Sequence, residues 1–370
     1  MDFLIIIFSF LFVLGLVVLV HELGHFVVAK RAGLRVDEFG FGYPPRAYGK
    51  KIGETVYSVN WIPFGGFVKI LGEDGAGEDN KRSLASQRKL VKAKIMAAGV
   101  FMNAVLTFVI LTILYVVGFY PLVPGMENHP GVSRNIYIED VVEETTASFA
   151  GLVSGDKIVS FAGNKIEKLE DFTSLAKENI DKETEIVIER NGSSISLNVV
   201  PYAEEINGEQ YSRIGITVLE EVSADNLFFA PIAGFLETFR MAYLTVLGIG
   251  QFFFNLFTQL SVPDGVVGPV GIAVVSGEVS KLGFSYLMQF VAILSISLAL
   301  LNLMPIPALD GGHLFILLLE KIRGKEISTK FKNTATLIGF AFMITLMIVI
   351  VAKDVVTFNL LEPFKKLFGG

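Results

Sequence analysis

The chain has 370 residues, of which 52% are hydrophobic and 18% are charged, and its mean hydropathy is +0.57. A charged fraction this low is unusual for a soluble domain, so we expect a membrane protein with some soluble mass. The formal net charge of −6 argues against nucleic-acid binding. The chain has no cysteine, which excludes disulfides, thiol catalysis and thiolate metal sites, and leaves the redox compartment open.

The first apolar run begins at Phe3, and Ser9 is its only polar side chain before position 21. About 20 apolar residues are enough to cross a bilayer. The run lacks both the basic start of a signal peptide and a small-residue cleavage site, so we expect it to be retained. These features predict a first transmembrane helix over residues 1–28.

This run leads into His-Glu-Leu-Gly-His at residues 21–25, which contains two of the four histidines. Positions i and i+4 share one face of a helix. His21 and His25 can therefore hold one metal ion, with Glu22 beside them as a general base. A plain membrane anchor would explain a lone histidine, but two at this spacing beside a glutamate favour a functional site.

Residues 29–94 are basic, with thirteen Lys/Arg against seven Asp/Glu. By the positive-inside rule this segment faces the cytoplasm. Within it, residues 55–62 and 65–71 predict a β-hairpin or short sheet next to the membrane, and residues 40–45 form an irregular apolar stretch.

Two interpretations of this sheet remain open. It is either a small cytoplasmic sheet or an edge strand that dips toward the metal and pairs with an extended substrate. In the second case the substrate-binding residues are Gly65, Gly66, Phe67 and Val68.

Residues 95–119 predict a second transmembrane helix, in which Asn103 is the one strongly polar side chain. Residues 120–225 are soluble and acidic, with twenty Asp/Glu against eight Lys/Arg. An acidic domain here and a basic loop before it agree on one orientation, with the domain outside the cytoplasm.

The acidic domain has mixed patterning. Strands are expected at 136–142 and 157–161, a helix at 170–179, and a hairpin at 185–200 that turns at Asn191-Gly192. An α+β fold follows from this order.

The third apolar span is residues 284–312, and it ends in an irregular sequence. Pro305 and Pro307 cannot continue a regular helix, and broken backbone at membrane depth persists only beside protein or water. Asp310 follows directly and is placed to be a third metal ligand. The alternative, a helix end emerging into water with Asp310 solvated, fits the local sequence equally well.

Residues 226–283 contain an apolar stretch that is long enough to span. If Asp310 joins the two histidines, the first and third spans must run in the same direction, and the second span already supplies the one crossing needed between them. We therefore predict that residues 226–283 form interfacial amphipathic helices on the outer side.

The remaining segments are a basic cytoplasmic loop at 313–333, a fourth span at 334–352 and an outer tail at 353–370. The predicted fold is a polytopic α-helical membrane protein. It has four transmembrane helices, a cytoplasmic membrane-associated β-loop and one extracytoplasmic α+β domain.

His21, His25 and Asp310 supply three protein ligands, the pattern of a catalytic zinc that keeps its fourth position for water. We expect one Zn²⁺ per chain. Zinc lowers the pKa of bound water to roughly 7, and Glu22 can take the proton. The amide of Asn302 can hydrogen-bond a substrate carbonyl or a developing oxyanion; its alternative role is to satisfy backbone freed by Pro305.

Four motifs together resemble the site-2 protease family, and the bacterial regulator-of-sigma-E proteases in particular. They are HELGH, GFGYPP at 40–45, GGFVK at 65–69 and NLMPIPALDGG at 302–312. The resemblance covers nearly the whole chain. It implies a zinc metalloendopeptidase whose ligands correspond to His21, His25 and Asp310 and whose general base corresponds to Glu22.

The same resemblance implies partners and a location. The substrates are single-pass membrane proteins, such as anti-sigma factors or signal-peptide remnants, cut within the bilayer after another protease has trimmed their outer domain. The expected location is the bacterial inner membrane, with the active site toward the cytoplasmic side.

Residues 147–152 and 155–158 resemble a PDZ domain of the kind found in periplasmic serine proteases. Such domains bind chain termini or act as size filters. The best-known members of the group carry two in tandem, whereas this chain has one such pattern. Its carboxylate-binding loop is expected near residues 131–138.

Two other functions are considered. A non-enzymatic PDZ membrane adaptor would hold a structural metal, but such zinc sites normally have four protein ligands, and His313 is the one spare candidate. An ion transporter would use intramembrane His, Glu and Asp, but the two halves of the chain lack the similarity that transporters often show.

Overall fold

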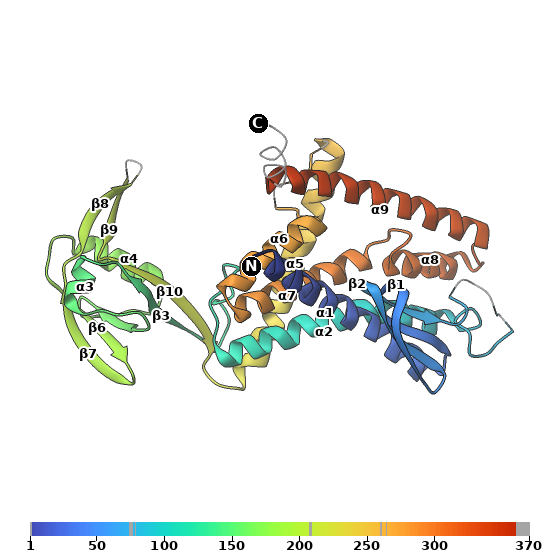
Figure 1. The fold of residues 1–370 in the computed structure, drawn as a ribbon, viewed down its shortest axis with the longest axis horizontal. Coiled ribbons are helices and arrows are strands. Elements are labelled where there is room, and N and C mark those ends of the chain that lie inside the picture. The colour runs from blue at the N-terminus through green and yellow to red at the C-terminus, as the bar shows by residue number, and fades with distance from the viewer. Residues whose placement is uncertain are drawn as a thin grey trace. The chain divides into compact units, whose positions relative to one another are not determined.

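A computed structural model describes residues 2–73, 77, 79–206, 209–259, 261–263 and 265–359 (Figure 1). It divides into two compact units. Unit 1 comprises Met1–Leu111 and Glu237–Gly370, and unit 2 comprises Thr112–Leu236.

Among the described residues, seven helices belong to unit 1 or to the segments that connect it to unit 2. They are α1 (Asp2–Arg31), α2 (Lys89–Val117), α5 (Phe229–Thr258), α6 (Pro269–Leu282), α7 (Phe284–Leu303), α8 (Asp310–Arg323) and α9 (Thr329–Thr357). Among the described residues, α1, α2, α5, α7 and α9 are long and apolar enough to cross a membrane. The chain is therefore a polytopic helical membrane protein, with one candidate span more than the four predicted.

Hydrogen bonds fix the direction of α7 against α2. Ser295 Oγ of α7 donates to Asn103 O of α2 at 2.9 Å, and Thr107 Oγ1 of α2 donates to Ala292 O of α7 at 3.1 Å. Residue numbers rise along one helix as they fall along the other, so the two helices are antiparallel.

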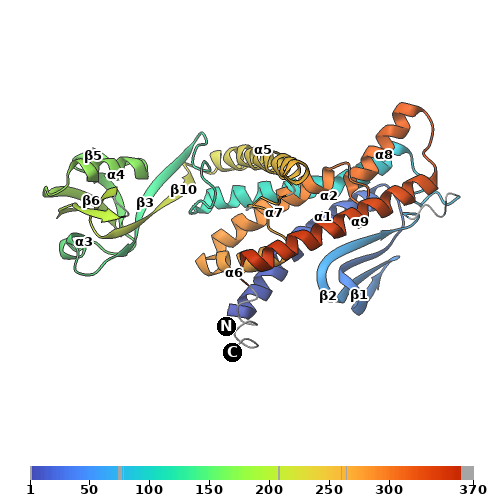
Figure 2. The same ribbon diagram turned by 90° about the horizontal axis from the view of Figure 1, so that it is seen from above.

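The α1 helix is antiparallel to α2 as well. His25 bonds to the carbonyl of Ile95, and a side chain at Gly24 would overlap the carbonyl oxygen of Ala98. Glycine therefore lets the two backbones approach closely. Because both are antiparallel to α2, α1 and α7 run in the same direction, as Figure 2 also shows.

The α9 helix runs opposite to α7. Gly339, early in α9, lies against the carbonyl of Pro307, just beyond the end of α7. Asp354, late in α9, accepts hydrogen bonds from the backbone N–H groups of Gly268 and Gly271 at the start of α6. Both ends of α9 are thus anchored to the segments on either side of α7.

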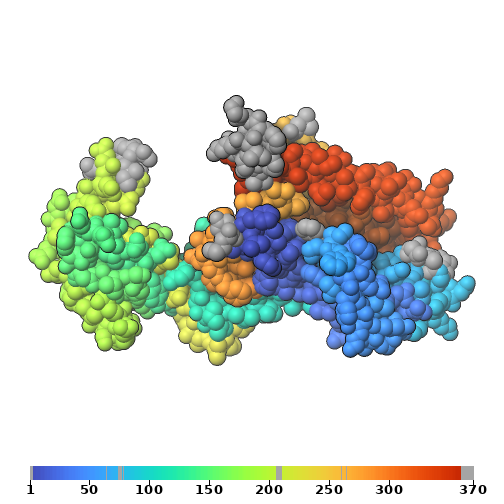
Figure 3. Space-filling view, viewed as in Figure 1, coloured from blue at the N-terminus to red at the C-terminus, as the bar shows by residue number. Residues whose placement is uncertain are grey.

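The basic segment after α1 folds into the strands β1 (Val36–Ile52) and β2 (Thr55–Ile70), seen in blue beside α1 in Figure 3. Both strands bend, so residues 36–41 pair with the start of β2 on one side and with its end on the other. Gly40, for example, pairs with both Ser58 and Phe67. In the part of the chain that the structure describes, residues 66–70 have strand partners on one side only and form an edge of this sheet.

The two strands predicted at 55–62 and 65–71 are present in a short sheet, as one of the two alternatives predicted. The other alternative, a hairpin of these two strands, is wrong, because both belong to β2 and residues 36–41 lie between them. This inserted strand overlaps the apolar stretch at 40–45. The glycines and prolines of that stretch concealed the strand in the sequence, because these residues are typical of turns.

Unit 2 holds a six-stranded antiparallel sheet of order β10-β3-β4-β6-β7, with β5 on β4. Its strands are β3 (Val132–Val141), β4 (Lys157–Phe161), β5 (Asn164–Lys165), β6 (Thr184–Arg190), β7 (Ser193–Val199) and β10 (Ile216–Ala224), with helices α3 (Thr146–Ala150) and α4 (Leu169–Glu178). A separate pair comprises β8 (Tyr202–Ile206) and β9 (Glu209–Arg213).

Alternate strand residues bury an aliphatic and aromatic core between the sheet and α4. Its largest fully buried members include Ile138, Ile158, Phe161, Ile186 and Ile188. The predicted strand at 157–161, the helix near 170–179 and the hairpin at Asn191-Gly192 are confirmed. The carboxylate-binding loop expected near 131–138 is wrong as a loop, because most of these residues lie in β3.

The third span and the loop after it also differ from expectation. The α7 helix ends at Leu303, so the predicted span of 284–312 is too long, and most of the cytoplasmic loop predicted at 313–333 is the helix α8. Residues 304–309 form a non-helical connection between the two helices. The prolines at 305 and 307 explain the end of α7.

Candidate active site

The α1 helix places His21 and His25 one turn apart on its buried face, with 6% and 8% of their surface exposed. Their Nε2 atoms lie 3.2 Å apart. The Nδ1 of His25 lies 2.7 Å from the carbonyl oxygen of Ile95 in α2. A carbonyl only accepts, so His25 Nδ1 carries the proton and its Nε2 presents a lone pair.

Asp310 comes to the same point from the far end of α7. It is the first residue of α8, and its Oδ2 lies 3.1 Å from His21 Nε2 and 3.3 Å from His25 Nε2. The carboxylate therefore stands at a helix N-terminus, where the macrodipole favours negative charge.

The connection before Asp310 is tightly packed. Side chains on Gly311 or Gly312 would overlap the carbonyls of Leu303 and Ile306, respectively. Ala308 has a φ of 106°, a region that residues with a side chain rarely adopt. The two glycines and this strained alanine hold the start of α8 against the preceding loop.

Three atoms thus face one another, the Nε2 of each histidine and Oδ2 of Asp310. The His25 lone pair and the carboxylate oxygen, 3.3 Å apart, repel unless a proton or cation lies between them. A tetrahedral zinc with bonds of about 2.0–2.2 Å sets its ligands roughly 3.3–3.5 Å apart. The donor set and its spacing therefore fit zinc. Among the described residues this is the group of His, Asp and Glu able to hold a metal, and His313 does not belong to it.

Glu22 lies on the next position of α1 and is half-buried. A methyl group at Gly66 would lie 3.3 Å from its Cγ and 3.1 Å from the carbonyl oxygen of Gly40. The edge segment of the β1–β2 sheet therefore passes directly beside the Glu22 side chain, and glycine at 66 permits this approach.

The other predicted substrate-binding residues divide into three groups. Asn302 is half-buried, and its Nδ2 lies 3.5 Å from His21 Nε2, beside the cluster. Gly65 has a positive φ of 76° and lies in β2 directly before the edge segment, to which Phe67 belongs. The side chain of Val68 is buried in the core between the sheet and α1, so only its backbone can meet a ligand.

Gly99 in α2 belongs to this site and was missed from the sequence. A methyl group there would lie 2.5 Å from His25 Nε2 and 2.6 Å from His21 Nε2. Its absence leaves the room in which the two imidazoles turn toward Asp310. The sequence offered one signal for this residue: Gly99 lies four residues before Asn103, the one strongly polar side chain of the second apolar span.

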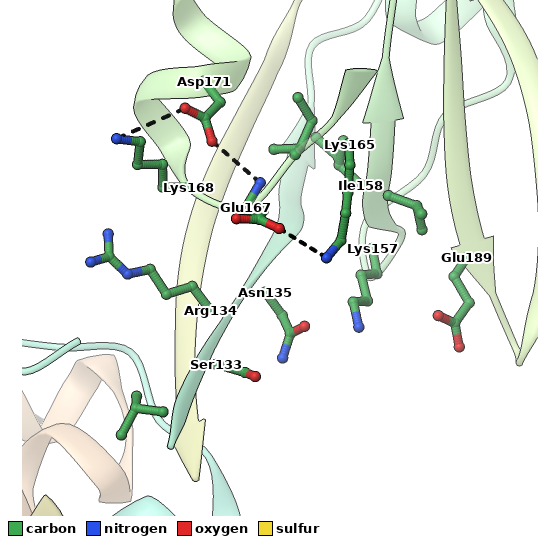
Figure 4. A pocket seen from close by; sticks show the side chains of 13 residues that line it. Ser133, Arg134, Asn135, Lys157, Ile158, Lys165, Glu167, Lys168, Asp171 and Glu189 are labelled. Atoms are coloured by element: carbon green, nitrogen blue, oxygen red, sulfur yellow. Dashed lines mark hydrogen bonds and ion pairs between the residues drawn. The ribbon is translucent and has the colours of Figure 1, made fainter. Parts of the chain in front are cut away.

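Unit 2 contains a cavity of about 660 Å³, bounded by the first residues of β3, by β4 and by the segment leading into α4 (Figure 4). Its lining includes Arg134, Lys157, Lys165 and Lys168. These are four of the eight Lys/Arg in an acidic domain. The acidic side chains of Glu167, Asp171 and Glu189 also line it.

Comparison with known proteins gives one family. Residues 9–346 match the model of peptidase family M50. CPE1693 of Clostridium perfringens is 35% identical over 92% of this chain and 95% of that protein. The regulator of sigma-W protease RasP of Bacillus subtilis is 28% identical over 94% of this chain and 98% of that protein. A solved PDZ domain of the SdrC-like protein from Listeria monocytogenes is 20% identical, covers 22% of this chain and 85% of that chain, and has a TM-score of 0.20.

Proposed function

Because the chain belongs to peptidase family M50 and is an intramembrane zinc metalloprotease, we propose that His21, His25 and Asp310 hold its zinc ion and that Glu22 is its general base. The observation that carries this assignment is the convergence of two imidazole Nε2 atoms and one carboxylate oxygen at 3.1–3.3 Å. Three protein ligands leave a position for water, as in catalytic zinc sites.

Bound zinc would supply an acidified water and a positive charge beside the scissile carbonyl. Glu22, adjacent to the cluster, takes the proton from that water and delivers it to the leaving amine. Asn302, 3.5 Å from His21 Nε2, donates its amide N–H to the developing oxyanion. The buried surroundings of the histidines restrict bulk water to what the reaction requires.

Substrate binding by the edge of the β1–β2 sheet follows from the position of Gly66. A helical transmembrane segment hides its carbonyls in its own hydrogen bonds, so it must be extended before hydrolysis. Residues 66–70 offer an open strand edge beside Glu22, and an extended substrate can add to it by main-chain hydrogen bonds. Gly65, Gly66, Phe67 and Val68 contribute through their backbone.

The direction of the helices supports four crossings. The α1 and α7 helices are parallel and α2 is antiparallel to both, so the chain between α2 and α7 starts and ends on one side of the membrane. The α6 helix has only 14 residues, and the described residues between α5 and α6 are not helical. A lipid-exposed return through them would leave backbone groups unpaired. We therefore place α5 at the outer surface.

The absence of cysteine makes this topology testable. Ser261→Cys, beyond α5, should react with a membrane-impermeant maleimide from the outside of intact cells. Ser328→Cys, before α9, should react only after permeabilisation. Labelling of both positions only after permeabilisation would mean that α5 crosses and that the four-crossing topology is wrong.

We propose that unit 2 lies outside and that the zinc site lies toward the cytoplasmic face of the bacterial inner membrane; the thirteen cations of residues 29–94 support this orientation. Substrates are single-pass membrane proteins whose outer domain has been trimmed. Unit 2 then binds the trimmed end of the substrate. Its lysine- and arginine-lined cavity suits a chain-terminal carboxylate.

Charge reversal tests the role of this cavity. Lys157→Glu with Lys165→Glu should slow cleavage of a trimmed substrate several-fold, whereas Lys177→Glu, on the same unit outside the cavity lining, should not. Equal rates for all variants would remove the cavity from substrate selection.

A structural metal in a membrane adaptor is the alternative. A site closed by four ligands would support it, and His313 was the expected fourth, but it lies outside the cluster. Glu22→Gln discriminates between the two functions. It should keep one zinc per chain and lower cleavage of a model transmembrane substrate by at least about 100-fold. Product masses would locate the cut, and undiminished cleavage would exclude Glu22 as the base.

A further inference from the structure

Among the described residues, three buried side chains of α1 and α2 have a polar atom without a hydrogen-bond partner, and two of them adjoin the histidines. One is Nδ1 of His21, the ring nitrogen that faces away from Asp310. The other is the side-chain amide of Asn103, whose Oδ1 and Nδ2 are both unpaired although the residue is completely buried. An unpaired buried polar group is costly, and most native ones prove to be satisfied by ordered water.

Both groups adjoin the same position, Gly99. A methyl group on Gly99 would lie 2.6 Å from Cε1 of His21, the ring atom bonded to Nδ1. Asn103 follows Gly99 by four residues in α2 and so lies on the same face. Helical side chains lean toward the N-terminus and cover the preceding turn. A side chain at position 103 that follows this rule lies over the turn that contains Gly99.

The two histidines differ in what orients them. His25 Nδ1 has the carbonyl of Ile95 at 2.7 Å, which sets its tautomer and its ring plane. Nδ1 of His21 has no such partner among the residues that the structure describes. Metal-binding histidines nearly always donate their second N–H to a carbonyl, a carboxylate or a water, because this raises the basicity of the ligating nitrogen.

We propose that Asn103 is the positioning residue for His21, through one buried water that accepts from His21 Nδ1–H and donates to Asn103 Oδ1. Such a water has at least two protein partners and further polar capacity at Asn103 Nδ2, which is what a buried water needs. The backbone carbonyl of Asn103 is already engaged by Ser295 and Thr107, so the turn that carries this amide is held on two sides. Asn103 would thus act on the metal through His21, without touching it.

This inference rests on the proposed zinc site, and the experiment separates the two. Zinc content of the purified full-length protein is measured first. A wild-type protein without zinc would contradict the proposed function itself. With zinc present, competition against a chromophoric chelator gives the zinc affinity of each variant, independently of proteolysis.

Asn103→Leu removes the amide while nearly preserving its volume. We expect its zinc affinity to fall about 10–100-fold, as for other partners of metal-binding histidines. Asn103→Asp keeps an acceptor oxygen and should stay close to wild type. The matched control is Thr107→Val, which removes a buried hydroxyl one turn further along α2 that bonds only to backbone carbonyls in the same layer.

A loss in Asn103→Leu alone supports the proposal. Unchanged affinity in Asn103→Leu, or an equal loss in Thr107→Val, overturns it, because the effect would then be absent or a matter of packing. If the Asn103→Leu variant does not insert into the membrane, the Asn103→Asp variant tests the proposal instead. A carboxylate acceptor makes His21 a stronger donor to the metal, so the visible absorption of the Co²⁺-loaded variant should shift, and an unshifted spectrum rejects the proposal.

Discussion

Two aspartates, one fully buried in unit 2 and one half-buried in unit 1, show how the partners of a carboxylate determine its chemistry. Asp156 in unit 2 is fully buried and accepts hydrogen bonds from Arg190 Nε at 2.6 Å, Arg190 Nη2 at 2.7 Å and the N–H of Val153 at 3.0 Å. Asp310 in unit 1 faces two imidazole nitrogens, one of which presents a lone pair. The first carboxylate is surrounded by proton donors, whereas the second faces a lone pair that only a proton or a cation can bridge.

The difference teaches that donor and acceptor balance identifies the functional carboxylate better than burial does. Asp156 is less exposed than Asp310, whose side chain keeps 18% of its surface. Asp156 nevertheless has a complete set of partners and stabilises the turn before β4. Substitutions in the two regions should therefore have separable effects, on stability in one and on metal binding in the other.

Asp310→Asn should have the largest effect. It keeps the shape of the side chain but supplies a poorer metal ligand, so zinc stoichiometry should fall from one per chain to near zero and proteolysis with it. The thermal stability of the metal-free protein should hardly change, because asparagine keeps the size of the side chain and an oxygen that can accept a hydrogen bond. A variant that retains full zinc would exclude Asp310 as a ligand.

Gly99→Ala should come next. The added methyl group would lie within 2.6 Å of both ligating nitrogens, so one imidazole must turn away. We expect zinc affinity to fall about 10–100-fold, measured by chelator competition. Gly248→Ala, in α5 with open space around the glycine, is the matched control. Unaltered zinc affinity in Gly99→Ala would show that the site accommodates the added methyl group, and would contradict the role of Gly99.

Asp156→Asn should affect only unit 2. Loss of the charge-assisted hydrogen bonds to Arg190 should cost about 2 kcal/mol. This free energy corresponds to an acceleration of amide hydrogen exchange in β4 and β6 of about 30-fold. The zinc content should stay at one per chain. Glu167→Gln removes an exposed partner of Lys165 and should leave exchange unaltered. Zinc loss in Asp156→Asn would mean that the two regions are coupled.

The smallest effect concerns the turn between β1 and β2. Hydrogen bonds from Arg82 and Lys30 hold the pKa of Glu54 at about 2, below its ordinary value of 4.5. Because the pKa of Glu54 is lower in the folded state than in the unfolded state, ionised Glu54 stabilises the fold at pH values above about 4.5. This stabilisation disappears as the pH falls from about 4.5 through about 2. The difference in denaturation midpoint between wild type and Glu54→Gln should therefore be constant from pH 6 to pH 8 and shrink in acid. Added salt should reduce it, because the cluster is exposed.

The sequence predicted those parts of the molecule that depend on local rules. The spacing of His21 and His25, the break at Pro305 and Pro307, and the turn at Asn191-Gly192 each determine local structure within a few residues. Their positions in the structure agree with these expectations. The family match also agrees with the motifs identified in the sequence.

The sequence was less informative where structure depends on long-range pairing. Residues 36–41 lie between the two ends of β2, and no local pattern marks a strand that pairs on both sides. The strand β10 closes the unit 2 sheet against β3 from about 80 residues away and was not predicted. Gly99 was missed because a glycine in a membrane helix has many roles, and only the positions of His21 and His25 reveal this one.

The separation of 289 residues between His21 and Asp310 has a consequence for biosynthesis. A ribosome makes α1 first, and Asp310 emerges only after unit 2 and the helix α7 have been synthesised. Until then the nascent chain carries two histidines and a glutamate without their third partner. If Asp310 is the third zinc ligand, as proposed, the protease stays inactive during its own insertion, and a chain that terminates before residue 310 cannot cleave neighbouring membrane proteins.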